Sequence, residues 1–204
     1  MIITEVKPLE DILSNLNRNF EIFIIGCSAC ATKCGTGGEK EVEALAGILK
    51  DRGYKIYNTL VLDTPCDERI VKKDFLKKIS GRNDIQIIVC ACGSGVQTIS
   101  SFLTLPIINA LNTMYIGSTR RIGVSNEYCQ ACGDCCLVEF EAHCPNTRCP
   151  KGMMNGPCGG MVNGKCEVNT ENDCIWYLIY KRKGTIGHYK EQRNSSKKSL
   201  KIDK

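Results

Sequence analysis

The sequence predicts an α/β protein in which a small doubly wound parallel sheet is followed by a cysteine-rich, metal-held module of the ferredoxin-like or zinc-finger-like kind. In the first half of the chain, short apolar runs alternate with amphipathic segments, as in parallel strands joined by helical crossovers. In the second half, nine of the 15 cysteines lie between Cys129 and Cys174, and aliphatic runs are few. A segment this small and this poor in apolar residues needs its metal to fold.

Three parts are expected along the 204 residues. Residues 1–118 form the α/β domain, residues 119–183 form the cysteine-rich iron-sulfur module, and residues 184–204 form a basic, disordered tail. The net charge of +5 arises at the end of the chain, because residues 181–204 contain nine Lys and Arg against two acidic residues. A Ser- and Lys-rich terminus without interleaved aromatic residues is usually solvated, so no nucleic-acid partner is expected.

The elements of the chain follow from hydrophobic periodicity. Apolar residues at helical spacing predict helices at residues 8–16, 39–52, 67–79 and 93–103. Apolar runs bounded by turn residues predict strands at residues 20–26, 55–63, 85–92 and 106–112. Residues 113–128 are expected to be a linker. Further along, the Asn163-Gly164 pair predicts a hairpin turn, and residues 175–180 predict a helix capped by the Asn172-Asp173 pair.

Cysteines stand where the predicted parallel strands end. Cys27, Cys66 and Cys92 each fall at the carboxyl end of a strand, and these ends share one edge of a doubly wound sheet, where ligands bind. Cys30 and Cys34 lie on the first loop over that edge. The helix that follows points its positive end at the same place, which favours thiolates. The sequence therefore predicts a metal or cluster site from these five cysteines, with a reactive thiol site or a plain cysteine-rich edge as the alternatives.

Two glycine-rich loops in this part do not match nucleotide-binding patterns. The loop from Gly35 to Lys40 lacks the spacing and the Lys-Ser/Thr ending of a phosphate-binding P-loop. The loop at Gly93 has Thr98 where a dinucleotide fingerprint has its third glycine. Both loops are interpreted as tight turns that let cysteines converge, and no catalytic or cofactor-binding residue is predicted. Cys90, deeper in its strand, is expected to be a small buried apolar residue.

The run from Cys129 to Cys174 indicates metal binding through thiolates. It opens with a C-x2-C-x2-C triple, and Cys144 precedes a proline, as the closing cysteine of a bacterial ferredoxin cluster does. Eight cysteines suffice for two cubane clusters: Cys129, Cys132, Cys135, Cys144, Cys149, Cys158, Cys166 and Cys174. In two-cluster ferredoxins the cysteine before proline serves the other cluster, so Cys144 is expected to join the later cysteines and Cys174 the triple. Cys136 is then left over.

Zinc is the alternative at one of these sites, and a disulfide framework is the third interpretation. Structural zinc sites usually pair two distant C-x2-4-C knuckles, often with a histidine, whereas this run has one such cluster and His143 as its only imidazole. The start of the chain has no secretory signal pattern, and no span of 18 apolar residues occurs. We therefore expect a cytoplasmic protein without a membrane span, where an odd number of cysteines is better explained by metal ligands than by disulfides.

Several cysteine-bearing strings of the chain, in order, resemble the MetV-type iron-sulfur subunit of methylenetetrahydrofolate reductase. The strings are Gly26–Leu45, Asp63–Arg69, Ala91–Thr98, Asn155–Gly160 and Asn163–Val168. The resemblance covers residues 1 to about 185. Cys90 and Cys136 are additional to the family pattern.

This resemblance implies an electron-transfer subunit that is not itself catalytic. It would relay electrons through two [4Fe-4S] clusters, with room for a third, to a flavoprotein catalytic subunit that reduces methylenetetrahydrofolate in the one-carbon metabolism of the acetyl-CoA (Wood-Ljungdahl) pathway. FMN would be bound by that partner alone, and an upstream electron donor would supply this chain. Two other functions stay open: a structural zinc-binding partner of the reductase, and a stand-alone enzyme that uses the N-terminal cysteines for thiol or methyl-transfer chemistry.

Overall fold

The computed structural model describes residues 1–79 and 81–184. The chain divides into two compact units, Met1–Asn126 and Glu127 onward, so the division falls several residues after the expected position between residues 118 and 119. From residue 185 onward, the predicted basic tail lies outside the described residues. Within the described ranges, the structure contains no helix with the length and apolar character needed to cross a membrane.

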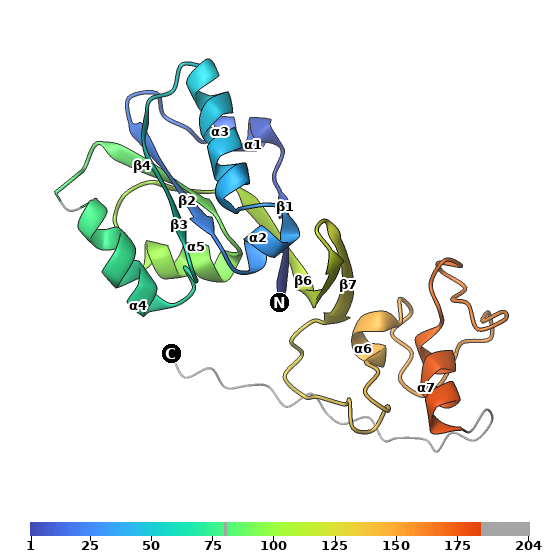
Figure 1. The fold of residues 1–204 in the computed structure, drawn as a ribbon. Coiled ribbons are helices and arrows are strands. Elements are labelled where there is room, and N and C mark those ends of the chain that lie inside the picture. The colour runs from blue at the N-terminus through green and yellow to red at the C-terminus, as the bar shows by residue number, and fades with distance from the viewer. Residues whose placement is uncertain (80, 185–204) are drawn as a thin grey trace. The chain divides into compact units, whose positions relative to one another are not determined.

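The first unit is built on the predicted parallel sheet (Figure 1). Its order is β3-β2-β4-β5, and each neighbouring pair of strands is parallel. The strands are β2 (Glu21–Cys27), β3 (Ile56–Leu62), β4 (Ile85–Cys90) and β5 (Ile107–Asn109). Every residue of β4 is buried, as expected for a central strand covered on both faces. The prediction of a parallel sheet with helical crossovers is confirmed.

Helices cover both faces of this sheet. They are α1 (Leu9–Leu13), α2 (Cys30–Cys34), α3 (Glu39–Asp51), α4 (Glu68–Ile70) with its continuations η1 (Val71–Phe75) and η2 (Leu76–Lys78), and α5 (Gly93–Ser100). Alternate residues of β2 face opposite cores, because side chains of a strand alternate between its faces. Phe23 and Ile25 pack with α5 and the α4 continuation, whereas Ile22 and Ile24 pack with α1 and α3. The doubly wound arrangement therefore follows from two apolar faces in one strand.

A second, three-stranded sheet overturns the expected linker at residues 113–128. Its order is β1-β6-β7, formed by β1 (Ile2–Val6), β6 (Leu111–Arg121) and β7 (Val124–Cys129). Strand β1 runs antiparallel to β6, and the amino group of Met1 donates a hydrogen bond to the Gly117 carbonyl at 3.0 Å. Most residues of β6 and β7 are half-buried or exposed, so backbone pairing defines these strands and the apolar pattern does not reveal them.

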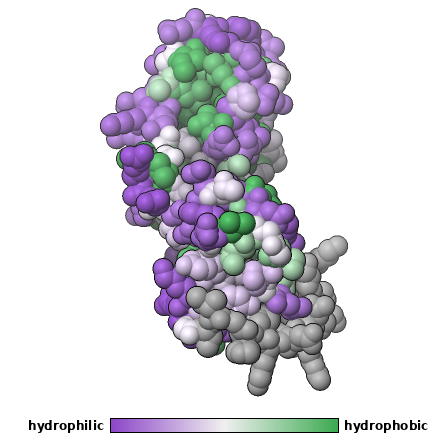
Figure 2. Space-filling model, turned by 90° about the vertical axis from the view of Figure 1, so that its right-hand side faces the viewer, coloured by the Kyte–Doolittle hydropathy of each residue, from purple (hydrophilic) through white to green (hydrophobic). Residues whose placement is uncertain are grey.

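The surface of the first unit is largely polar. Figure 2 shows an apolar patch on one face of this unit, within a mostly hydrophilic surface. The exposed large apolar side chains of the unit include Val6, Ile48, Tyr57, Met114 and Ile122. Exposed apolar side chains are common on folded proteins, so no function follows from them alone.

The second unit has little regular structure and a small aromatic core. Its helices are α6 (Pro145–Arg148) and α7 (Ile175–Lys183). Phe140 meets Trp176 edge-on, with ring centroids 5.3 Å apart and both side chains buried. The predicted hairpin turn is confirmed, because Asn163 and Gly164 have positive φ and a bridge pairs the residues on either side. The N-cap of α7 is Cys174 rather than the Asn172-Asp173 pair, so a cysteine occupies the position nearest the helix start.

Candidate metal centres

Four cysteines meet at the carboxyl edge of the parallel sheet, and we call Cys27, Cys30, Cys66 and Cys92 the edge thiols. Cys27 ends β2, Cys30 begins α2, and Cys92 is the N-cap of α5. Cys66 follows β3 and is exposed, whereas Cys27 is buried. As the N-cap, Cys92 lies at the positive end of the α5 helix dipole.

The pKa of Cys66 depends on the other three edge thiols. Although Cys66 is exposed, partial desolvation of its sulfur raises the pKa of the thiol, and the negative charge of Cys92 raises it further. Cys27 and Cys30 contribute in the same direction. The structure thus brings together residues that are far apart in sequence.

Cys34 does not point toward the edge thiols. Its sulfur donates to the Ile2 carbonyl of β1 at 3.7 Å. Cys90 is buried in the core, and burial raises the pKa of its thiol to about 12. The interpretation of Cys90 as a small buried apolar residue is therefore confirmed, and the first loop offers Cys30 rather than Cys34 to the sheet edge.

The glycine-rich loop after α2 is a tight turn packed on the sheet. The Cys27 amide donates to the Gly37 carbonyl at 2.8 Å. A Cβ atom at Gly37 would lie 2.1 Å from the Cys90 carbonyl oxygen, so only glycine fits at this position. This close approach keeps the loop that carries Cys30 against the ends of β2 and β4.

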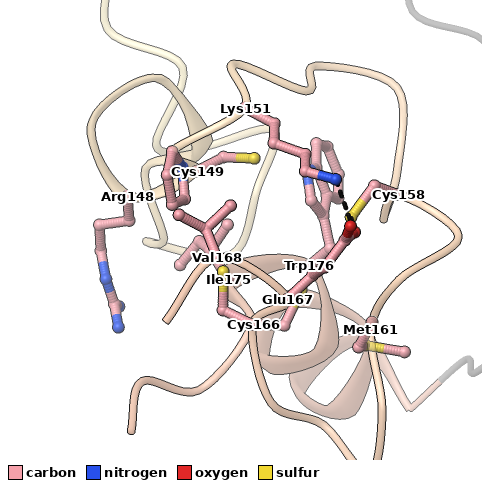
Figure 3. Close-up of a pocket in the computed structure, with 12 residues that line it drawn as sticks. Arg148, Cys149, Lys151, Cys158, Met161, Cys166, Glu167, Val168, Ile175 and Trp176 are labelled. Atoms are coloured by element: carbon pink, nitrogen blue, oxygen red, sulfur yellow. Dashed lines mark hydrogen bonds and ion pairs between the residues drawn. The ribbon is translucent and has the colours of Figure 1, made fainter. Parts of the chain in front are cut away.

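In the second unit, four cysteines line one cavity, and we call Cys149, Cys158, Cys166 and Cys174 the cavity thiols. The cavity has a volume of about 20 Å³, and Figure 3 shows Cys149, Cys158 and Cys166 around it. Cys149 is the C-cap of α6 and Cys174 the N-cap of α7. The amides of Cys166 and Cys174 donate to Asn172 and Gly164 carbonyls, so the hairpin turn fixes both cysteines.

Charged and polar groups surround the cavity thiols. Lys151 Nζ contacts Glu167 Oε2 at 2.5 Å, and the Cys158 thiol donates to the same oxygen at 3.4 Å (Figure 3). These two contacts hold the pKa of Glu167 below its usual value, and the contact with Lys151 has the larger effect. The Met153 amide donates to the Cys149 sulfur at 3.4 Å. Ile175 and Trp176 form an apolar wall.

A second group of sulfurs in this unit surrounds Asn146, and we call Cys132, Cys136 and Cys144 the loop thiols. Asn146 Nδ2 lies 3.8 Å from the Cys132 sulfur and 3.9 Å from the Cys136 sulfur. The pKa of the Cys136 thiol is raised to about 11, mainly by burial and then by the nearby Cys144. Cys129 and Cys135 are exposed.

The expected exchange of Cys144 and Cys174 between two clusters does not fit this arrangement. Cys174 lines the cavity with the later cysteines, and Cys144 lies beside Cys136. The reason is local: Cys144 precedes α6 and Cys149 ends it, so this short helix directs the two cysteines to different groups.

The donor chemistry of the edge, cavity and loop thiols fits a thiolate-bound metal. In the part of the chain that the structure describes, no three Cys, His, Asp or Glu side chains come together closely enough to hold a single metal ion. The sulfurs are therefore gathered in groups rather than around one point. His143 Nδ1 lies 2.8 Å from the Glu141 carbonyl oxygen, a contact that occupies one of its two ring nitrogens.

Spacing alone missed several residues of these groups. Cys136 was left over because the C-x2-C-x2-C triple accounts for its neighbours without it. Asn146, Lys151 and Glu167 carry no motif, and only the folded chain shows that they contact sulfurs or their partners.

A protein-family model described as "Methylene-tetrahydrofolate reductase C terminal" matches residues 108–200. The matched segment contains all the cavity thiols and loop thiols. No curated protein and no solved structure matches the chain. The matched segment is therefore similar to the C-terminal part of a reductase.

Proposed function

We propose that this protein binds iron-sulfur clusters through its cysteines and passes electrons to a flavoprotein that reduces methylenetetrahydrofolate. The observation that carries the proposal is the cavity lined by four cysteines within the segment that the family model matches. Cysteine thiolates are the usual ligands of iron-sulfur clusters. The proposal assigns Cys149, Cys158, Cys166 and Cys174 to one cluster.

The surroundings of the cavity thiols support an electron-transfer role. A cluster bound there would accept and release one electron at a potential set by its charge, hydrogen bonds and exposure. The Met153 amide donates to the Cys149 sulfur, and Lys151 places a positive charge near Cys158. The apolar side chains of Trp176 and Ile175 keep water from one side of the site. The Met153 amide and the Lys151 ammonium would stabilise added negative charge on the ligands.

The two sulfur groups of the second unit are close enough to act in sequence. Cys144 belongs to the loop thiols and Cys149 to the cavity thiols, and α6 between them is about 6 Å long at about 1.5 Å per residue. Cys136 and Cys149 both pack against the core of Phe140 and Trp176. Two clusters held by these groups would therefore be neighbours, as a relay requires.

We extend the proposal to the edge thiols of the first unit, where a third cluster would be bound. Cys27, Cys30, Cys66 and Cys92 supply four sulfurs from separate segments of the chain. The carboxyl edge of a doubly wound sheet is a common ligand site, which supports this assignment.

A structural zinc site is the second candidate, because four cysteines also form a tetrahedral zinc site. Zinc requires its four ligands around one point, whereas each sulfur bound to a cubane contacts a different iron. The cysteine run opens with a C-x2-C-x2-C triple of the kind found in ferredoxins, which favours the cluster. Under the zinc reading, the protein braces the reductase and carries no electrons.

The experiment is electron delivery to the reductase. The full chain is purified anaerobically with its flavoprotein partner, and reduction of the flavin by dithionite-reduced protein is followed in a stopped-flow instrument. The proposal predicts rapid flavin reduction by the wild type and loss of this phase in Cys158→Ala, with the complex intact. Equal rates for wild type, Cys158→Ala and zinc-loaded protein would refute the relay and support the structural role.

A further inference from the structure

Two adjacent cysteines of the second unit, Cys135 and Cys136, have opposite surroundings. Cys135 closes the C-x2-C-x2-C triple and is exposed, as are Cys129 and Cys132. Cys136 is outside that triple, is half-buried, and packs against the core that contains Phe140 and Trp176. Spacing includes Cys135 in the triple and leaves Cys136 out, whereas in the structure it is Cys136 that packs against the core.

The backbone holds Cys136 in place. Its carbonyl accepts hydrogen bonds from the amides of Glu139 at 3.2 Å and Phe140 at 3.3 Å, which closes a helical turn. The side chain of Phe140 is buried, so this turn is anchored to the core. A sulfur on an anchored turn loses little further freedom when it binds a ligand, which favours it over a sulfur on an exposed loop.

Asn146 links Cys136 to Cys132 and Cys144. It lies in the first turn of α6, two residues after the N-cap residue Cys144. The Gln130 side chain donates to the Asn146 carbonyl at 3.0 Å and ties the cysteine loop to this helix. The Asn146 amide then reaches both sulfurs, at 3.8 Å to Cys132 and 3.9 Å to Cys136. An amide shared by two sulfurs is the kind of outer contact that orients metal ligands and tunes bound clusters.

Cys129 lies on the same loop, three residues before Cys132. The Ala131 amide donates to the Cys129 sulfur at 3.3 Å. Ala131, between Cys129 and Cys132, has a φ of 54°, and Gly133, directly after Cys132, has a φ of 85°, so both residues lie in the left-handed region. A non-glycine residue adopts that region at a cost, which is often found at ligand sites.

Resting on the proposed function, we infer that Cys129, Cys132, Cys136 and Cys144 bind one iron-sulfur cluster, that the Asn146 amide hydrogen-bonds two of its ligands, and that Cys135 is not a ligand. The Asn146 amide contacts the sulfurs of Cys132 and Cys136. In this assignment Cys136, which the spacing pattern does not use, takes the place of Cys135, the third cysteine of the triple.

The adjacent cysteines provide a matched pair of variants. Full-length wild type, Cys135→Ser and Cys136→Ser are purified anaerobically, and iron and acid-labile sulfide are measured per chain. We expect Cys136→Ser to lose about four iron atoms, one cubane's content, and Cys135→Ser to keep the wild-type content. Loss of iron in Cys135→Ser with full content in Cys136→Ser would overturn the assignment while leaving the proposed function intact. Wild-type protein without iron would instead refute the proposed function.

Asn146→Leu tests the assignment even where Cys136→Ser does not fold. This variant keeps every cysteine, so its iron content should equal that of wild type. Redox titration followed by EPR should show one cluster with a more negative midpoint potential, because a hydrogen bond that stabilises the reduced cluster is lost. An unchanged potential at full iron content would overturn the role of Asn146 and with it the inclusion of Cys136.

Discussion

Replacing Trp176 should weaken the second unit and the cavity thiols together. Trp176 is 1% exposed, its ring meets Phe140 edge-on, and its Nε1–H donates to the Met153 carbonyl at 3.0 Å. The Met153 amide in turn donates to the Cys149 sulfur. One side chain therefore supports both the core of this unit and the loop that carries a cavity thiol.

The magnitude follows from these contacts. Truncating a buried Trp to Ala costs about 3–5 kcal/mol, and the lost edge-on pair with Phe140 adds about 0.5–1.5 kcal/mol. We expect Trp176→Ala to lower the local stability of α7 by about 4–6 kcal/mol. Trp176→Phe keeps an aromatic ring but removes the Nε1–H donor, so it should cost about 1–2 kcal/mol, near the low end because Met153 is only half-buried.

Hydrogen exchange of the full chain, read by mass spectrometry, measures this effect without relying on tryptophan fluorescence. Protection of α7 amides should fall in the order wild type, Trp176→Phe, Trp176→Ala. Peptides from β4, in the core of the first unit, serve as the internal control and should not change. Equal protection of α7 in wild type and Trp176→Ala would contradict the reasoning.

Three further predictions concern other parts of the chain. Gly37→Ala should destabilise the first unit in urea unfolding, because its Cβ would clash with a backbone oxygen of β4, whereas Gly47→Ala in α3, with nothing within 4 Å, should stabilise it by about 0.5–1 kcal/mol. The hydrogen bond from Arg82 holds the pKa of Asp84 below 3.8, so its contribution to folding stability is complete above pH 3.8 and is lost as the pH falls through the lower pKa of the folded state. In urea unfolding at a series of pH values, Arg82→Ala should therefore lose less stability than wild type over this acid range. Lys151→Met should shift the midpoint potential of one cluster to a more negative value in an EPR redox titration, since a positive charge near Cys158 is removed; an unchanged potential would contradict this.

The parallel sheet could be predicted because its buried strands are recognisable in the sequence as apolar runs. The runs that form β2 and β4 are apolar on both faces, and each is followed by a turn and an amphipathic helix. The sheet of β1, β6 and β7 could not be found in the same way. Strand β1 pairs with residues of β6 more than 100 positions away, and most side chains of β6 and β7 are half-buried or exposed. Backbone pairing across that distance has no local signature.

The sequence predicted that groups of cysteines would form, but it was less successful in predicting which cysteines belong to each group. Topology alone placed Cys27, Cys66 and Cys92 at one edge of the sheet, because parallel strands end there together. It could not separate Cys30 from Cys34, which lie at opposite ends of the short helix α2 and point to different neighbours. Membership depends on the direction of each side chain, which spacing does not encode.

The most direct test of the iron-sulfur proposal is metal and sulfide analysis of the full chain, purified without oxygen from cells supplied with iron, combined with EPR of the dithionite-reduced protein. The proposal predicts about eight iron atoms and eight sulfides per chain from the second unit, about four more of each if the edge thiols are occupied, and EPR signals of interacting reduced [4Fe-4S] clusters. Stoichiometric zinc with no sulfide and no EPR signal would contradict it.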